Sequence, residues 1–391
     1  MYRKRSYTEI LQDDEIYDSH KSNIPFPLLV LAKNLQLGKA NKEKNFVFSP
    51  TSIQLALSLV ANGSTGSTLN EFLTFLEAKD LNHLNSVAVE LIEMLTDTTE
   101  GGPTMSFVGG VWVDQSLALK PTFQATAESI YRANAKSEIN EWAAEATNGL
   151  IKSILPPDTK AMAVLANAIY FKGTWKEKFE KKRTKEFPFY LADGTSSVAV
   201  PFMTSWKDQY ISTFDDFKVL TLPYQKGIIS SKSSLSMHII LPNQVNGIWR
   251  LIERVGSDPS FFKTHVRCRK KVRVGQFRIP KFKMEHGFEA SEDLKNINLK
   301  LPFEDEAEFG EMVEGQRLQI DKVHHKAYIE VNEEGTEAAA VTAMSMIEGC
   351  CAFVSPPTPV DFVADHPFMF VARDYKNGMI LFMGHVINPS L

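Results

Sequence analysis

The chain has 391 residues, of which 43% are hydrophobic and 23% are charged, with a formal net charge of -4. These values are typical of a globular protein with a large buried core, in one large domain or two smaller ones. Nucleic acids and anionic membranes attract clustered Lys and Arg, so the acidic balance, with one short basic cluster at Arg3-Lys4-Arg5, argues against both as partners.

The first 22 residues are polar, and we expect a disordered tail over 1–22 followed by a single domain over 23–391. No long apolar run precedes Asp13-Asp14-Glu15, so the sequence predicts no signal peptide, and no segment is apolar enough to span a membrane. Cys268, Cys350 and Cys351 are a poor disulfide framework and suit a reducing compartment. We therefore expect a cytoplasmic protein, with the nucleus as the alternative location.

The first third of the chain reads as mostly helical. Helical periodicity covers residues 28–37, 53–61, 69–76, 81–95 and 121–133, with short strands at 46–48 and 108–113. From residue 163 the chain is rich in β-branched and aromatic residues, which predicts strands at 163–171, 219–222, 235–241, 272–279, 368–373 and 379–386. Asn377-Gly378 predicts a hairpin between the last two strands. Helices followed by strands in one body indicate an α+β fold.

Catalytic motifs are missing from the sequence. Neither H-E-x-x-H nor G-x-S-x-G occurs, and the glycine-rich run at 62–67 lacks the lysine of a phosphate loop and reads as a turn between helices. His324-His325 could bind a metal only with ligands from elsewhere, and we prefer a hydrogen-bonded core His325 with His324 facing solvent. No neighbouring motif would activate Cys350 or Cys351 as a reactive thiol. The sequence therefore predicts neither an enzyme nor a metal or cofactor site.

The segment after Gly335 supports two conformations. Its alanines, methionines and glutamate favour a helix over 337–346, whereas Gly335 and the prolines downstream favour an irregular connection. With a period of two, one face holds small or uncharged side chains, which are Thr336, Ala338, Ala340, Thr342 and Met344. Such a segment could lie outside as a loop and still enter a sheet, because it would bury no unpaired charge.

Four motifs in order along the chain resemble one protein family. The segment Glu333-Glu334-Gly335-Thr336-Glu337-Ala338-Ala339-Ala340 resembles the hinge of an inhibitory serpin. Three further runs are similar to the family's early strand-to-helix motif, central strand and C-terminal signature: residues 45–53, 167–175 and 365–368. Residues 360–368 and 101–103 resemble the plant branch. The resemblance implies an α+β serpin fold of three β-sheets and about nine helices, with an exposed reactive-centre loop over residues 333–359.

The resemblance also implies a function. Inhibitory serpins are suicide substrates of serine or cysteine endopeptidases, which attack the loop, form an acyl-enzyme, and are trapped in a covalent complex when the cleaved loop inserts into the main sheet. We accordingly expect a monomer whose partner is a target protease. The family's spacing from Glu333 places the reactive bond at Gly349-Cys350, with Glu348-Gly349 and Cys350-Cys351 as alternatives one residue away.

Two further groups of residues match positions of the family. Ser49, Ser52, Asn167 and His325 match the shutter, the buried polar cluster beneath the opening of the sheet, and Trp175, Lys281 and Glu333 match the breach above it. At the breach, Lys281 and Glu333 are expected to pair across strands. One departure is a shortened segment at 136–142, before the helix that crosses the main sheet. It motivates the alternative of a non-inhibitory serpin that acts as a binding, chaperone-like or storage protein.

Overall fold

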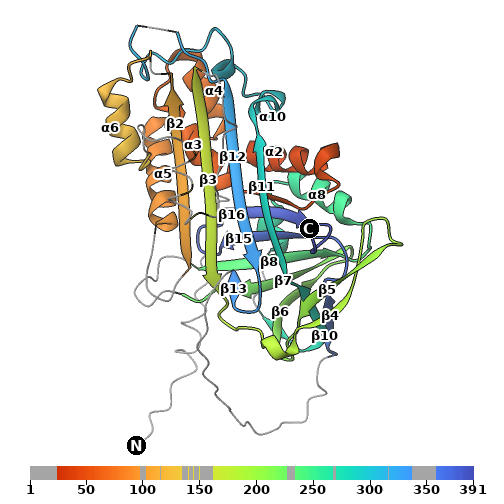
Figure 1. Ribbon diagram of the computed structural model, residues 1–391. Helices are drawn as coiled ribbons and strands as arrows, with labels where there is room; N and C mark the ends of the chain where they lie inside the picture. The colour runs from red at the N-terminus through yellow and green to blue at the C-terminus, as the bar shows by residue number, and fades with distance from the viewer. Residues whose placement is uncertain are drawn as a thin grey trace, which may run out of the picture.

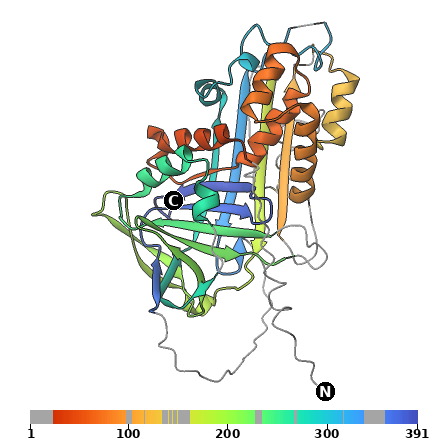
Figure 2. The same cartoon turned by 180° about the vertical axis from the view of Figure 1, so that it is seen from behind.

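The computed structural model describes residues 24–96, 103–114, 116–133, 162–226, 234–266, 270–315, 317–336 and 358–391, together with residues 140, 144 and 149. The tail at 1–22, most of the segment 136–142 and residues 337–357 lie outside this description. Helices gather at one end of the molecule, and long strands run from there to the other end (Figure 1). Seen from behind, helices from the first third of the chain cover the back of these strands (Figure 2).

Eight α-helices are present in the described residues. They are α2 (Phe26–Leu37), α3 (Pro50–Ala61), α4 (Gly66–Phe75), α5 (Leu81–Leu95), α6 (Pro121–Ser129), α8 (Ile248–Ser257), α9 (Phe261–His265) and α10 (Ser291–Asn296). The five helices predicted from periodicity are all present, and the glycine-rich run at 62–67 connects α3 to α4 as expected. The prediction for α6 ran too far, because Arg132 adopts a positive φ of 50° that no helix continues through.

The strands form three sheets, as expected. Sheet A, the longest in its strands, consists of β11 (Phe282–Glu289), β12 (Lys322–Val331), β3 (Ala163–Thr174), β2 (Thr104–Val113) and β13 (Gly335–Thr336). Sheet B has seven strands: β1 (Phe46–Phe48), β16 (Ile380–Val386), β15 (Phe368–Asp374), β8 (Leu235–Pro242), β7 (Phe217–Pro223), β6 (Gln209–Thr213) and β9 (Lys271–Val272). Sheet C has four: β14 (Val360–Val363), β10 (Val274–Pro280), β5 (Ser197–Met203) and β4 (Lys185–Tyr190).

Two sheet predictions can be compared directly with these strands. The hairpin at Asn377-Gly378 is confirmed, because β15 and β16 pair antiparallel around it. The single strand predicted over 272–279 is wrong. The chain leaves sheet B after Val272 and enters sheet C at Val274, since β9 pairs with β6 whereas β10 pairs with β5 and β14. Apolar periodicity continues through this change of sheet and therefore gives no sign of it.

Helix α3 links sheet A to sheet B. All of its 12 residues are buried, and it contacts β2 and β3 of sheet A and β16 of sheet B. Ser49 caps its N-terminus, where the Ser49 Oγ accepts the Ser52 N–H at 3.2 Å. The cap fixes the polar start of α3 directly beneath the centre of sheet A, because Ser52 Oγ also reaches Asn167 on β3.

The two central strands of sheet A separate at one end. Strands β12 and β3 pair in parallel from Lys322↔Val164 to Tyr328↔Tyr170. Beyond this point β3 pairs instead with β13, antiparallel, through Gly335↔Thr174 and Thr336↔Gly173. Strand β13 lies between the ends of β3 and β12 (Figure 1). The chain therefore turns back after β12 and places two residues in the gap between its neighbours.

Candidate functional site

The turn that leads into β13 depends on a glycine. Within it, the Asn332 N–H donates to the Gly335 carbonyl at 2.8 Å. Gly335 has a φ of 147°, and a Cβ built there would lie 2.0 Å from the Gly173 carbonyl oxygen. An L side chain neither adopts this φ readily nor fits this space, so only glycine allows the chain to enter sheet A here.

Thr336, the second residue of β13, is fully buried, with 0% of its surface exposed. Its Oγ1 lies 3.0 Å from the hydroxyl of Tyr224, a residue that the sequence analysis did not identify. The Tyr224 ring stacks on Trp175 with centroids 4.5 Å apart. Burial raises the pKa of Tyr224, so its hydroxyl stays protonated and available for this hydrogen bond.

The breach residues predicted from the resemblance lie together around Glu333. Its Oε2 is 3.0 Å from Lys281 Nζ, its Oε1 accepts a hydrogen bond from Thr184 Oγ1 at 2.7 Å, and its side chain is only 6% exposed. Burial raises the pKa of Glu333, but the bonds from Thr184 and Lys281 outweigh burial and bring it below its usual range. Trp175 Nε1 donates to the Asn332 carbonyl at 2.9 Å. Glu333 is therefore ionised and fixed in position at the start of the hinge.

Glu334 is held by a second set of cations that sequence reasoning missed. Lys178 Nζ lies 2.9 Å from its Oε2 and Lys181 Nζ 3.3 Å from its Oε1. The hydrogen bond from Lys178 is the main reason that the pKa of Glu334 is below its usual range. Both lysines precede Glu334 by about 150 residues, so no local pattern in the sequence could relate them to it. A shallow polar hollow of about 330 Å³ lies over these groups and includes Lys181, Lys281 and Glu330 in its lining.

The four shutter residues also meet, all of them buried. His325 on β12 lies opposite Asn167 on β3, and its Nδ1 is 2.5 Å from Asn167 Oδ1. Ser52 Oγ donates to the same Oδ1 at 2.5 Å, and the Ser49 N–H donates to His325 Nε2 at 3.2 Å. Because Nε2 accepts this hydrogen bond, Nδ1 carries the proton. The network joins β3, β12 and α3 at the point where the two strands are still paired.

Burial strongly affects the titration of the histidines on β12. It lowers the pKa of His325 to about 3, with the charge of His286 adding to the effect, so His325 is neutral at pH 7. The prediction that His324 faces solvent is wrong, since only 9% of it is exposed, and burial lowers its pKa as well. The prediction assumed that one face of the strand was open to water, but Val323, His324 and His325, which alternate between the two faces of β12, are all buried.

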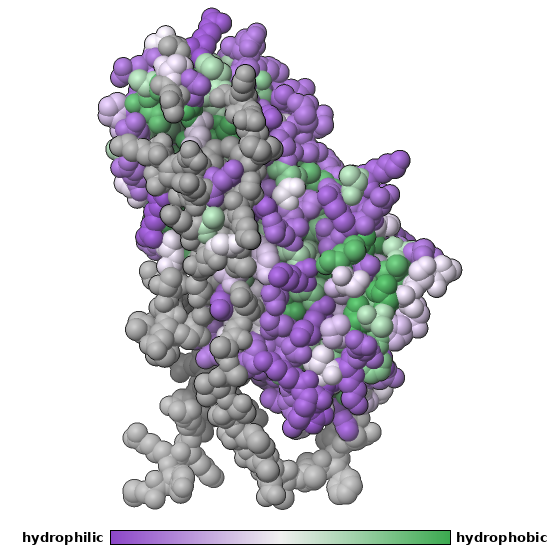
Figure 3. All heavy atoms as spheres, in the orientation of Figure 1, coloured by the Kyte–Doolittle hydropathy of each residue, from purple (hydrophilic) through white to green (hydrophobic). Residues whose placement is uncertain are grey.

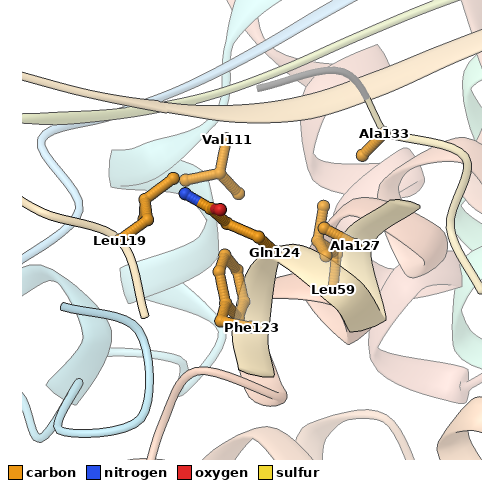
Figure 4. Close-up of a pocket in the computed structure, with 7 residues that line it drawn as sticks. All are labelled: Leu59, Val111, Leu119, Phe123, Gln124, Ala127 and Ala133. Atoms are coloured by element: carbon orange, nitrogen blue, oxygen red, sulfur yellow. The ribbon is translucent and has the colours of Figure 1, made fainter. Parts of the chain in front are cut away.

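A separate apolar cavity lies between α3, β2 and α6 (Figure 4). It has a volume of about 10 Å³, which is room for at most one water molecule, and Gln124 is the one polar side chain in its lining. It is too small to be a ligand site. Within the described ranges there is also no cluster of three or more His, Cys, Asp and Glu residues that could hold a metal, and no helix long and apolar enough to cross a membrane.

The remaining predicted site residues lie outside the described part of the chain. They are the hinge residues Glu337, Ala338, Ala339 and Ala340 and the residues around the expected reactive bond, Glu348, Gly349, Cys350 and Cys351. The hinge can therefore be followed from Glu333 to Thr336, and the choice between helix and strand for 337–346 stays a prediction.

Comparison with known proteins identifies the family. The family model described as serpin (serine protease inhibitor) matches residues 31–389. The chain belongs to the serpin family. Among its relatives, Serpin-ZXA of Oryza sativa subsp. japonica is 45% identical over 89% of this chain and 91% of its own length. Serpin-ZX of Arabidopsis thaliana is 42% identical over 92% and 95%. The resemblance to plant serpins stated from the sequence is thus confirmed.

Solved structures confirm the serpin fold. The native stressed conformation of Arabidopsis AtSerpin1 superposes with a TM-score of 0.84 at 39% identity, covering 96% of this chain and 99% of that one. A complex of thyroxine-binding globulin with thyroxine superposes with a TM-score of 0.77 at 22% identity, covering 94% and 98%. Since a protein named for binding thyroxine shares the fold, the serpin fold alone does not decide between inhibition and binding.

Proposed function

We propose that this serpin is a suicide-substrate inhibitor of serine or cysteine endopeptidases, acting as a monomer, a single domain over 23–391, in the cytoplasm. The observation that supports inhibition best is strand β13. Gly335 and Thr336 already occupy the gap between β3 and β12 as the first residues of an antiparallel strand, with the Thr336 side chain buried. A cleaved loop would need only to extend this strand.

Extending the register of β13 along β3 gives a concrete arrangement. Glu337 would lie opposite Lys172, Thr342 opposite Asn167, and Met346 opposite Ala163, where β3 begins. Oppositely charged residues favour the first of these pairs. The small side chains Ala338, Ala340 and Thr342 would share the buried face of Thr336. For residues 337–346 this arrangement favours a strand after cleavage.

The same register suggests how the protease would be disabled. The nucleophile of the protease attacks the carbonyl of Gly349, the peptide bond to Cys350 breaks, and Cys350 leaves with a new amino terminus, so Gly349 is held as an ester or thioester. Gly349 follows Met346 by three residues, so insertion would carry it past the far end of β3, roughly 40 Å along the sheet at about 3.3 Å per residue. Hydrolysis of the acyl bond needs an intact oxyanion hole, which such traction on the protease would distort.

A single substitution makes this proposal testable. Residues 337–357 contain neither Lys nor Arg, so Gly349→Arg would give trypsin one cleavage site in that segment. We expect the variant to form a complex with trypsin that survives denaturing electrophoresis. Mass spectrometry should locate the acyl bond at residue 349. The wild-type chain should form such a complex with a serine or cysteine protease that accepts small residues.

The matched control blocks insertion without changing the cleavage site. Thr336→Glu in the Gly349→Arg background places a charged side chain at a position with 0% exposure and adds no trypsin site, so β13 cannot extend, and trypsin should cleave the loop at residue 349 and dissociate without forming a stable complex. If Gly349→Arg itself were cut quantitatively without a stable complex, and the cut protein melted no higher than the intact one, the inhibitor function would be refuted.

A further inference from the structure

One tryptophan of the described residues is unusually exposed. Trp206, in the connection between β5 and β6, has 67% of its surface in contact with solvent, and the Arg183 guanidinium lies over its ring at 6.0 Å. A single exposed apolar side chain is common on protein surfaces, so the significance of Trp206 depends on the residues around it. Trp and Arg are also the residue types that contribute most binding energy at protein interfaces.

Trp206 lies next to cations, since Arg183 packs over its ring and Lys207 follows it in the chain. We call the group Lys181, Lys182, Arg183, Trp206, Lys207 and Lys271 the cationic surface. Its most exposed cations are Lys182, with 80% of its side chain accessible, Lys181 with 67% and Lys207 with 53%. The acids that pair with them are less exposed, 41% for Glu180 and 39% for Glu177. The outermost layer is therefore positive on a chain whose net charge is -4.

The cationic surface is continuous with the hinge. Glu177 joins its two sides, because it pairs with Lys271 and lies 3.9 Å from Lys207. At the other edge Lys181 binds Glu334, the residue before β13 begins. In Figure 1 the short yellow-green coil that contains Lys181–Arg183 lies at the lower end of the molecule, near β13 and β6. The described surface at this end is mostly hydrophilic (Figure 3).

We propose that the cationic surface is a docking site for the target protease, and that this protease carries acidic residues beside its active-site cleft. The inference rests on the proposed function, since it requires a protease to reach the loop that starts at Thr336. A body that attacks that loop comes within reach of the surface, because Lys181 contacts the hinge itself. Opposite charges would accelerate the encounter, and Trp206 would provide apolar contact once the two proteins meet.

A nucleic acid is a less suitable occupant. Regularly spaced phosphates favour an unbroken positive surface, whereas Glu177 and Glu180 interrupt the cations here and Asp208 is exposed at the edge. A protein partner can match such mixed charges residue by residue.

Trypsin provides a probe, because its anionic and cationic isoforms share one specificity and differ in surface charge. We would measure the rate at which each isoform consumes the intact loop of the Gly349→Arg protein, as cleaved product plus complex, at low and high salt. We expect the anionic isoform to react faster, and Lys182→Glu/Arg183→Glu to slow it about tenfold at low salt and hardly at 0.5 M NaCl. The cationic isoform should become faster with the same variant.

Two variants separate the charge effect from a change in fold. Lys300→Glu/Arg317→Glu makes the same change of charge on two exposed residues close to α4, η4 (Leu301–Phe303) and the start of β12, and should leave both rates within twofold of the parent. Trp206→Ala should slow both isoforms to a similar extent at any salt concentration, because it removes contact area and no charge.

Each outcome bears on a different proposal. Equal rates for the two isoforms, unchanged by Lys182→Glu/Arg183→Glu, would overturn the docking site even if stable complexes form and inhibition stands. A rate difference without any stable complex would support docking and refute inhibition. The third outcome concerns DNA. If the wild-type protein bound a double-stranded DNA oligonucleotide, and Lys182→Glu/Arg183→Glu abolished that binding without changing either trypsin rate, the surface would be a polyanion site and the proposal would be wrong.

Discussion

At the scale of single residues, the hydrogen bond between Tyr224 and Thr336 holds the hinge in sheet A. Both groups are buried, so the loss of one leaves the other without a partner in a place that water does not reach. The two residues lie 112 positions apart in the sequence and come from different parts of the fold, β13 and the chain just after β7. The bond therefore stabilises the inserted start of the loop specifically.

Tyr224→Phe should lower the free energy of unfolding by about 1–2 kcal/mol, because Thr336 Oγ1 becomes a buried hydroxyl without a partner. Thr336→Val added to Tyr224→Phe removes that hydroxyl while conserving shape, and should recover most of the loss. Urea unfolding of both single variants and the double variant measures the coupling. If the double variant lost as much unfolding free energy as the two single variants together, the two side chains would not act as a pair.

At the scale of elements, β13 depends on the close approach of two backbones. Gly335→Ala would place a Cβ 2.0 Å from the Gly173 oxygen and force an L residue to a φ of 147°. We expect β13 to leave the sheet, with faster amide exchange in peptides that span 171–175 and 335–337. Gly194→Ala is the control, because Gly194 also has a positive φ, 72°, but no atom within 4 Å of the added Cβ. Unchanged exchange in Gly335→Ala would contradict this account.

The elements also show what sequence can predict. Helices α3 and α5 and strand β1 were predicted closely, because their apolar spacing reflects burial against one neighbour or on all sides. The change of sheet at Arg273 was not predicted, since the apolar alternation runs without interruption from Val272 in β9 to Val274 in β10. At the site, motif matching placed His325 with Asn167 and Glu333 with Lys281. The roles of Tyr224, Lys178 and Lys181 depend on contacts across the fold and leave no local pattern.

At the scale of the whole molecule, five buried histidines couple stability to pH. Burial is the main cause that lowers the pKa of His238 and His325 to about 3 and that of His286 and His385 to about 4, from 6.5. Burial also lowers the pKa of His324. The unfolded chain therefore binds more protons than the folded one below pH 6.5. The stability that these neutral histidines contribute is complete above pH 6.5 and is lost as the pH falls toward 4 and then 3.

Each of these histidines should lower the free energy of unfolding by up to about 1.4 kcal/mol for each pH unit below 6.5. Urea unfolding between pH 7.5 and 5.5 should show this decline, and His238→Gln should reduce its slope by about a fifth. The quantity compared between the wild type and the variant is the slope of unfolding free energy against pH. A substitution that lowers stability equally at every pH does not change this slope. A variant with the slope of the wild type would mean that His238 titrates normally in the folded protein.

The two residues of β13 have a kinetic consequence. Adding a strand to a sheet is slowest at its first contact, because the chain must be ordered before further pairs repay that entropy. Gly335 and Thr336 have passed this nucleation step in the uncut protein. Under the proposed mechanism, the cleaved loop would extend strand pairing that already exists. Insertion would therefore be faster, and more of it would be complete before the acyl bond is hydrolysed.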